Sequence, residues 1–289
     1  MSKIKILTHR GLEPSKDKFF PESSYEAFED QLSRGFGIEF DINFTSDEVI
    51  ISHDSNLKRI TNGKDNRSFS EITYDELKDV ICSNSSIGTI PRFSQVMELI
   101  KNSHSLINAI HLKGKFQEIE KIDSIIRVLK KYKDIFDKIL VFDVKPKVAR
   151  YLKSNIPKIQ IAPSVAHSYD IKRYNSYVGG TLISIEDAIK FKHEGLYDWV
   201  WLDEWDTISS SKGHKKFYTQ KIFHKLREGG YKIALVTPEL HGTSPGLLGK
   251  EFHSDARNKY ILFKRIKDIL LLNPDAVCTD WPEEVSKLL

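Results

Sequence analysis

The chain has 289 residues, of which 40% are hydrophobic and 29% are charged. These proportions are typical of a globular protein with enough apolar material for one large core or two small ones. The 15 glycines and 10 prolines are at background level, which excludes collagen-like and low-complexity chains. The formal net charge of +4 comes from 44 basic and 40 acidic residues spread along the chain, so we expect no nucleic-acid partner.

Two cysteines, Cys82 and Cys278, lie far apart in the sequence and belong to no Cys-x-x-Cys or Cys/His pattern. They therefore indicate neither a disulfide framework nor a structural zinc site. The apolar stretch Ile4–Leu7 is too short for the core of a signal peptide, and no apolar run approaches the roughly 20 residues that cross a bilayer. We expect no transmembrane segment and a cytoplasmic location. The oligomeric state stays open.

Short β-branched or aromatic runs alternate with amphipathic stretches, which is typical of βα units around a parallel sheet. Strands are predicted at 3–8, 37–44, 48–52, 107–112, 138–143, 159–165, 198–203, 232–237 and 276–279. Helices are predicted at 25–34, 94–101, 116–132, 147–154, 217–228 and 260–272. Only three residues separate the second and third strands, so these two should form an antiparallel hairpin and leave eight parallel strands.

Eight βα units in a chain of this length predict an α/β protein of the (β/α)8 TIM-barrel class. An open doubly wound sheet is less favoured, because Gly35 and Gly37 precede a strand, whereas a phosphate-binding glycine turn would follow one. We expect a single domain over residues 1–289. The polar segment 55–92, with one short helical pattern at 74–80, should form a small cap over the barrel mouth.

Active groups of such barrels lie at the carboxyl ends of the strands. Glu39 and Asp41 are two residues apart on one strand and therefore share a face, which makes them a half-built site for a hard divalent cation. Surface charge on an edge strand is the alternative interpretation. Histidines follow the first strand and the hairpin, as His9-Arg10 and His53-Asp54. Two histidines, an arginine and a carboxylate pair are what metal-assisted cleavage of a phosphodiester requires.

These motifs together resemble the glycerophosphodiester phosphodiesterase family, and especially a cytoplasmic branch that ends in Thr-Asp-hydrophobe-Pro. The resemblance is dense over residues 8–61, sporadic to about 113 and weak until the final motif. It rests on His9-Arg10-Gly11, Pro21-Glu22-Ser23-Ser24-Tyr25-Glu26-Ala27-Phe28, Gly37-Ile38-Glu39-Phe40-Asp41-Ile42, Thr45-x-Asp47, Ile51-Ser52-His53-Asp54-x-x-Leu57-x-Arg59-x-Thr61 and Thr279-Asp280-Trp281-Pro282.

The resemblance implies a barrel with an inserted cap and one divalent cation that hydrolyses a small-molecule phosphodiester to a phosphomonoester and an alcohol. It implies that His9 and His53 are the general acid/base pair, that Arg10 and Lys113 bind the phosphate oxygens, and that Glu39 and Asp41 are metal ligands. Glu22 matches a Pro-Glu-Asn element near the substrate, although Ser23 stands where asparagine is usual. Whether water attacks directly or a substrate hydroxyl first forms a cyclic phosphate stays open.

The chain departs from the family at its fourth motif, where His111-Leu112-Lys113 replaces Glu-x-Lys. The two carboxylates make Mg²⁺ or Ca²⁺ the expected cation. An imidazole suits Zn²⁺ or Mn²⁺ better than Ca²⁺, so Mn²⁺ or Zn²⁺ is the alternative. Either His111 completes the metal site or another carboxylate does. Glu239 is the first candidate for that carboxylate and Asp203-Glu204 the second.

The loops after later strands should shape the pocket for the alcohol, and they carry Trp201, Trp205, His241 and Ser244-Pro245-Gly246. Aromatic walls with hydrogen-bonding neighbours favour a sugar or nucleotide moiety, with His241 as a substrate-binding residue. Two other functions are considered. One is a phospholipase D-like lyase, although such proteins are typically secreted and disulfide-bonded. The other is a catalytically silent barrel that binds a phosphorylated ligand or a partner protein.

Overall fold

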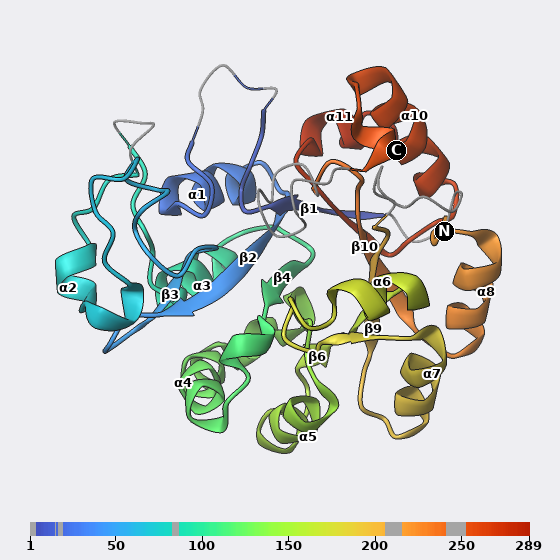
Figure 1. Ribbon diagram of the computed structural model, residues 1–289, viewed down its shortest axis with the longest axis horizontal. Helices are drawn as coiled ribbons and strands as arrows, with labels where there is room; N and C mark the ends of the chain where they lie inside the picture. Colours follow the sequence, from blue (N-terminus) through green and yellow to red (C-terminus); the bar gives the residue numbers. More distant parts are fainter. Residues whose placement is uncertain (1–3, 15, 17–19, 83–86, 206–215, 241–252) are drawn as a thin grey trace.

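The computed structural model describes residues 4–14, 16, 20–82, 87–205, 216–240 and 253–289 (Figure 1). The described residues form one sheet of eleven strands with helices around it. Along the chain the strands are β1 (Lys5–His9), β2 (Gly37–Phe44), β3 (Val49–Ile51), β4 (Asn108–His111), β5 (Ile139–Phe142), β6 (Gln160–Ile161), β7 (Ser164–Ala166), β8 (Leu182–Ile183), β9 (Trp199–Asp203), β10 (Lys232–Val236) and β11 (Ala276–Thr279). Only β3 pairs in the antiparallel sense, with β2, as the short turn between them predicts.

The sheet closes into a barrel through the short strands β6 and β7. Both belong to the continuous segment 160–166, whose first part pairs with β5 and whose second part pairs with β9. On the other side, β1 pairs with both β2 and β11. Counting this segment as one strand, the ring contains the eight expected members: β1, β2, β4, β5, β6 with β7, β9, β10 and β11. The predicted (β/α)8 fold with its hairpin is therefore confirmed.

Helices alternate with the barrel strands, and most of them cover the outside of the ring, whereas α2 belongs to the segment 55–92 (Figure 1). They are α1 (Tyr25–Ser33), α2 (Tyr74–Leu77), α3 (Phe93–Lys101), α4 (Ile119–Leu129), α5 (Pro146–Asn155), α6 (Ser168–Tyr174), α7 (Ile185–His193), α8 (Gln220–Glu228), α10 (Lys259–Leu270) and α11 (Pro282–Ser286). Four 3-10 segments join them: η1 (Phe69–Glu71), η2 (Gly114–Phe116), η3 (Lys130–Lys138) and η4 (Ser254–Ala256).

The elements that the sequence pattern does not predict are short or weakly amphipathic. β8 has two residues, α6 seven and α11 five. The α7 helix has nine residues, of which only Ala188 is fully buried, while Ile185 and Phe191 are partly buried against the core. Hydrophobic periodicity needs a longer or more deeply buried element to be visible.

Strand β2 shows how side-chain alternation divides the core. Ile38, Phe40 and Ile42 are fully buried in the large apolar cluster between the ring and its helices. Successive side chains of a strand point to opposite faces, so Glu39 and Asp41 point into the barrel. Gly37, at the start of the strand, allows a close approach to β4, because an added Cβ would lie 1.9 Å from the carbonyl oxygen of Ile107. The alternation along β2 thus places the carboxylates of Glu39 and Asp41 inside the barrel.

The segment 55–92, expected as a cap, has an apolar cluster of its own beside β3. Isolated bridges join Asn56 to Ser68 and Ile81 to Thr89 across this segment. In Figure 1 its helix α2 lies beyond β3, at the left end of the molecule. The buried members of the cluster are Ile50, Leu57, Phe69, Ile72, Tyr74, Leu77, Cys82 and Ile90.

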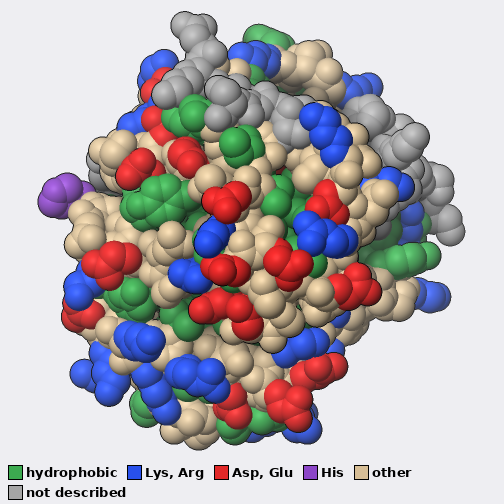
Figure 2. Space-filling model, turned by 90° about the vertical axis from the view of Figure 1, so that its left-hand side faces the viewer, with side chains coloured by type: hydrophobic (Ala, Val, Ile, Leu, Met, Phe, Trp, Pro, Cys, Tyr) green, Lys and Arg blue, Asp and Glu red, His purple; other side chains and the backbone are tan. Residues whose placement is uncertain are grey.

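Figure 2 shows the face of the molecule that lies at the left in Figure 1, where acidic and basic side chains are interspersed over most of the surface. Among the described residues, no helix is both long enough and apolar enough to cross a membrane.

Candidate active site

A cavity of about 1030 Å³ opens at the carboxyl ends of the barrel strands. Its lining combines residues after β1, β2, β4, β5 and β9 with residues 53–63 from the hairpin and the start of the cap. The predicted site residues that line it are His9, Arg10, Glu39, Asp41, His53, His111, Lys113, Asp203, Trp201 and Trp205. The cavity is large enough for a small organic ligand.

The turn after β1 places His9 and Arg10 in the barrel mouth. Arg10 and Gly11 both have left-handed backbone, with φ of 54° and 74°, so the chain reverses at once after the strand. Glycine suits the second position because it tolerates positive φ and because an added Cβ would lie 2.9 Å from the Cβ of Ala27. The backbone N–H of Arg10 donates to the carbonyl of Glu39 at 3.0 Å. The His-Arg-Gly motif is therefore a tight turn locked onto β2.

The register of the parallel strands brings the predicted residues together. His9 is the cross-strand partner of Glu39, and Asp41 is the partner of His111. Partners in a parallel pair point to the same side of the sheet, so all four side chains enter the barrel mouth. Groups separated by about 100 residues in the sequence thus meet within one short stretch of sheet.

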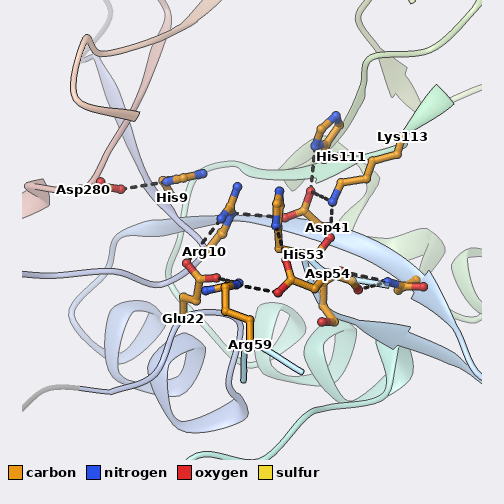
Figure 3. A network of polar contacts seen from close by, with 12 residues as sticks. His9, Arg10, Glu22, Asp41, His53, Asp54, Arg59, His111, Lys113 and Asp280 are labelled. Carbon is orange, nitrogen blue, oxygen red and sulfur yellow. Dashed lines mark hydrogen bonds and ion pairs between the residues drawn. The ribbon is translucent and has the colours of Figure 1, made fainter. Parts of the chain in front are cut away.

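Each of the two predicted catalytic histidines is paired with a carboxylate (Figure 3). His9 Nδ1 lies 2.9 Å from Oδ1 of Asp280, and His53 Nδ1 lies 2.9 Å from Oδ1 of Asp54. Asp54 is held in turn by Arg59, whose Nε donates to its Oδ2 at 2.5 Å. A carboxylate on Nδ1 keeps the proton there and leaves Nε2 as the basic nitrogen, which is the arrangement of a general acid or base.

The surroundings of both histidines lower their pKa values. Burial lowers the pKa of His9 well below its usual value, and the neighbouring Arg10 guanidinium adds to the effect. Burial also lowers the pKa of His53, assisted by Lys113 and Arg10, while Asp41 and Asp54 oppose the shift. Both shifts favour the neutral form of the imidazole.

Asp41 is the centre of a cluster of positive groups (Figure 3). Its Oδ1 lies 2.8 Å from His111 Nδ1 and 3.2 Å from Lys113 Nζ, and its Oδ2 lies 3.4 Å from Arg10 Nε. Although burial favours the neutral acid, Lys113 and the surrounding histidines and arginine hold the pKa of Asp41 well below its usual range. Arg10 Nη1 also contacts Glu22 at 3.4 Å, and Glu22 pairs with Arg59. Glu22 thus orients the predicted phosphate-binding arginine.

Glu39 has the features of a carboxylate prepared for a cation. It is 4% exposed, and its Oε2 has no hydrogen-bond partner among the described residues. Burial and the adjacent Asp41 raise its pKa to about 8. Glu39, Asp41 and His111 each offer one ligand atom, and these atoms lie within 4.8 Å of one another. Two carboxylates and an imidazole suit a divalent cation, so the donor set fits the metal that the resemblance implies.

Glu239 follows β10 and contacts the end of β11, and it is not part of this three-residue cluster. Its Oε1 accepts hydrogen bonds from Oγ1 of Thr237 at 2.7 Å, Oγ1 of Thr279 at 2.6 Å and the backbone N–H of Asp280 at 3.1 Å. Burial and the nearby Asp280 raise its pKa to about 7. In this position Glu239 anchors the turn that carries Asp280, the partner of His9.

The two carboxylates after β9 have separate surroundings. Asp203 lines the cavity, whereas Glu204 is buried and binds Arg265 Nη2 at 2.6 Å. Glu204 Oε2 also accepts from the backbone N–H groups of Phe217 and Tyr218 at 2.5 and 2.6 Å. Glu204 therefore ties the end of β9 to the segment that precedes α8.

Aromatic side chains form another part of the cavity wall, next to His111. Trp201 stacks on Phe142 with ring centres 3.8 Å apart, and Phe142 stacks on His111 at 4.7 Å. Trp205 packs against Tyr174, and Tyr177 stands at the rim with 74% of its surface exposed. His241 and the Ser244-Pro245-Gly246 turn lie outside the described residues.

Several functional contacts come from residues that the sequence reasoning did not select as site residues. Asp54 and Asp280 belong to the motifs that carry the resemblance, but those motifs imply no role for them, and the sequence pattern predicts Asp143 only as the end of a strand. The sequence does contain a signal for each: Asp54 follows His53, Asp280 follows a predicted strand, and Asp143 is the last residue of one. Tyr177 follows α6, a helix that the pattern does not predict, and nothing in the sequence marks it.

Comparison with known proteins shows which family the sequence matches. Residues 9–180 match the model of the glycerophosphoryl diester phosphodiesterase family. A glycerophosphodiester phosphodiesterase of Bacillus altitudinis is 30% identical over 291 residues, covering 98% of this chain and 97% of that protein.

Solved structures share the fold. A phosphodiesterase of Oleispira antarctica, crystallised with the product sn-glycerol-3-phosphate, has a TM-score of 0.64 at 18% identity and covers 98% of this chain and 96% of its own. A glycerophosphodiester phosphodiesterase of Parabacteroides distasonis has a TM-score of 0.63 at 16% identity, with coverage of 99% and 96%.

Proposed function

Because the chain belongs to the glycerophosphoryl diester phosphodiesterase family and is thus a phosphoric diester hydrolase, we propose that it cleaves its substrate with two histidines and one bound divalent cation. The proposed substrate is a glycerophosphodiester-like or sugar phosphodiester, and the products are a phosphomonoester and an alcohol. One observation supports this most strongly. His9 and His53, each with a carboxylate on Nδ1, line the same cavity as the Glu39, Asp41 and His111 cluster.

Glu39, Asp41 and His111 are the residues that would hold the cation. A divalent cation supplies Lewis-acid polarisation of a phosphoryl oxygen and neutralises charge that develops in the transition state. Mg²⁺ or Ca²⁺ suits the two carboxylates, and Mn²⁺ or Zn²⁺ suits the imidazole.

Arg10 and Lys113 are the proposed phosphate-binding residues. Both side chains contact Asp41. These ion pairs place two positive charges beside the cation cluster and restrict the movement of both side chains. Lys113 Nζ also donates to the backbone carbonyl of His53 at 2.5 Å, which links the phosphate-binding and proton-transfer groups. Such preorganised charge stabilises a phosphorane-like transition state without reorganisation during the reaction.

The two histidines share the proton transfers. One Nε2 removes a proton from the attacking hydroxyl, and the other imidazole protonates the departing alkoxide. An anionic phosphodiester between them offsets the neighbouring Arg10 and Lys113, which favours protonation of the histidine that acts as the acid. His9 and His53 are proposed as the acid and the base together, without assigning either role to one of them.

The aromatic wall is the proposed site for the alcohol or sugar portion. Trp201, Trp205 and Tyr177 offer flat apolar surfaces, and Asp203 adds a hydrogen-bond acceptor at the end of β9. Rings that carry both an apolar face and hydroxyl groups fit such a surface.

The proposal is tested with the full-length protein after treatment with a chelator. Hydrolysis of glycerophosphocholine, glycerophosphoinositol and a sugar phosphodiester is followed by ³¹P NMR, with Mg²⁺, Ca²⁺, Mn²⁺ or Zn²⁺ restored singly. We expect activity to disappear with chelation, to return with at least one cation and to yield a phosphomonoester. Cleavage that a chelator does not affect would contradict the cation, and an accumulating cyclic phosphate would identify a lyase. Exclusive cleavage of glycerophosphocholine would reject a sugar substrate.

Glu39→Gln is the matching variant, because it removes one charge from the cluster with little change in volume. Several kcal/mol of transition-state stabilisation depend on a bound cation, so kcat should fall by about 10³-fold or more. Glu29→Gln, on the surface of α1, is a control that should retain full activity.

A further inference from the structure

His111 lies between two carboxylates, one on each ring nitrogen. Its Nδ1 is 2.8 Å from Oδ1 of Asp41, and its Nε2 is 3.3 Å from Oδ2 of Asp143. Asp41 belongs to the three-residue cluster that could hold a cation, whereas Asp143 does not. The Nδ1 atom therefore faces a carboxylate of the cation cluster, whereas the Nε2 atom faces a carboxylate that does not belong to the cluster.

The backbone is bent to bring Asp143 to this place. His111 is paired with Phe142 across β4 and β5, so strict alternation would turn the next residue, Asp143, away from the barrel mouth. Asp143 instead has a φ of 65°, in the left-handed region that side chains other than glycine seldom adopt. The residue is 4% exposed and lines the cavity. Backbone strain of this kind is retained at functional sites when the surrounding structure holds it in place.

Gln117 provides that support. Its Nε2 donates to the carbonyl of Leu112 at 2.7 Å and to the carbonyl of Asp143 at 2.6 Å, while its Oε1 accepts from Lys145 N–H at 2.8 Å. One amide side chain thus joins the turn after His111 to the turn that contains Asp143. The Phe142 ring, nearly parallel to the imidazole at 13°, fixes the plane of His111 as well.

We propose that Asp143 is a positioning residue that accepts the Nε2 proton of His111, so that Nδ1 is held as the nitrogen ligand of the cation. This inference rests on the proposed function, since it needs a cation at Glu39, Asp41 and His111. A metal-bound histidine usually donates its other N–H to a carboxylate, which selects the tautomer, fixes the ring and increases the basicity of the ligand nitrogen. In this chain His111 is the proposed ligand, and Asp143 is the carboxylate that accepts its second N–H.

The test measures binding of Co²⁺ to the cation-free protein by calorimetry, with the visible absorption of bound Co²⁺ as a second readout. Asp143→Asn keeps an acceptor of similar shape, tolerates positive φ and removes the charge that holds the proton. We expect it to weaken Co²⁺ binding by about 10- to 100-fold and to change the absorption spectrum. Asp75→Asn removes an exposed carboxylate of α2 that lies outside the cavity and should change binding by less than about threefold.

A second background separates positioning from a general loss of negative charge. In His111→Glu the cluster has a carboxylate in place of the imidazole, so there is no ring for Asp143 to orient. Asp143→Asn should then leave the affinity for Co²⁺ unchanged or improve it, because two carboxylates no longer repel each other. An equal loss in both backgrounds would show that only charge matters and would overturn the inference.

The outcomes distinguish the two proposals. If the unaltered protein binds no divalent cation, the cation site itself is wrong, and Asp143 has no ligand to position. If the unaltered protein binds Co²⁺ and Asp143→Asn binds it equally well with the same spectrum, the cation site stands and the role of Asp143 is refuted. Circular dichroism of each variant verifies that the fold is retained.

Discussion

The cavity has a charged half, formed by β1, β2, β4 and the start of the cap, and an aromatic half, formed by β5, β9 and the segment after α6. In the charged half, hydrogen bonds and ion pairs hold most of the functional side chains, as Asp280 holds His9 and Asp54 holds His53. In the aromatic half the side chains are held by ring packing, such as Trp201 on Phe142. In the proposed mechanism the phosphodiester bond is broken in the charged half, and the alcohol substituent binds in the aromatic half. Substitutions in the first half should therefore change kcat, and those in the second should change KM.

The largest of the remaining effects should come from the histidines. We expect His9→Ala and His53→Ala each to lower kcat by about 10²-fold or more while the fold is retained, because each removes one partner in proton transfer. Steady-state kinetics and circular dichroism provide the measurement. His224→Ala, on an exposed histidine of α8, is the control and should be fully active. Near-normal turnover of either cavity variant would remove that histidine from the mechanism.

An intermediate effect should appear in the pH profile of Asp54→Asn. The Asp54 carboxylate raises the pKa of His53 against burial and the neighbouring cations, so its loss should lower this pKa further. One limb of the kcat/KM profile should then move toward acid pH and the other should stay in place. If the acidic limb moves, His53 is the base. If the alkaline limb moves, His53 is the acid.

The control for this profile is Asp65→Asn, in an exposed Asp–Arg pair of the cap, which should leave both limbs unchanged. A shift toward alkaline pH in Asp54→Asn, or no shift of either limb, would show that Asp54 does not govern the protonation of His53.

The smallest effect should come from the aromatic half. Tyr177 lines the cavity but is largely exposed, so Tyr177→Ala should leave folding intact and raise KM about fivefold, with kcat changed by less than about twofold. Tyr260→Ala, on an exposed tyrosine of α10 outside this cavity, should change neither constant. A fall in kcat without a change in KM would contradict the idea that the charged half sets kcat and the aromatic half sets KM.

Sequence patterns predicted the barrel well because its strands are short apolar runs separated by helical stretches. They also selected Glu39 and Asp41, because residues two apart on a strand share a face whatever the rest of the fold does. They could not predict that Asp280 holds His9, since 271 positions separate the two and only the pairing of β1 with β11 joins them. The approach of Asp143 to His111 depends on one positive φ, which periodicity does not reveal.

The pairing of β1 with β11 also orders events during synthesis of the protein. The cations and carboxylates of β1, β2 and β4 are made early, and they have their neighbours in the sheet once β4 and β5 exist. His9, although it is made among the first residues, obtains its carboxylate only after residue 280 has been added and β11 has paired with β1. The proposed proton-transfer pair is therefore incomplete until the last strand of the ring has taken its place beside the first.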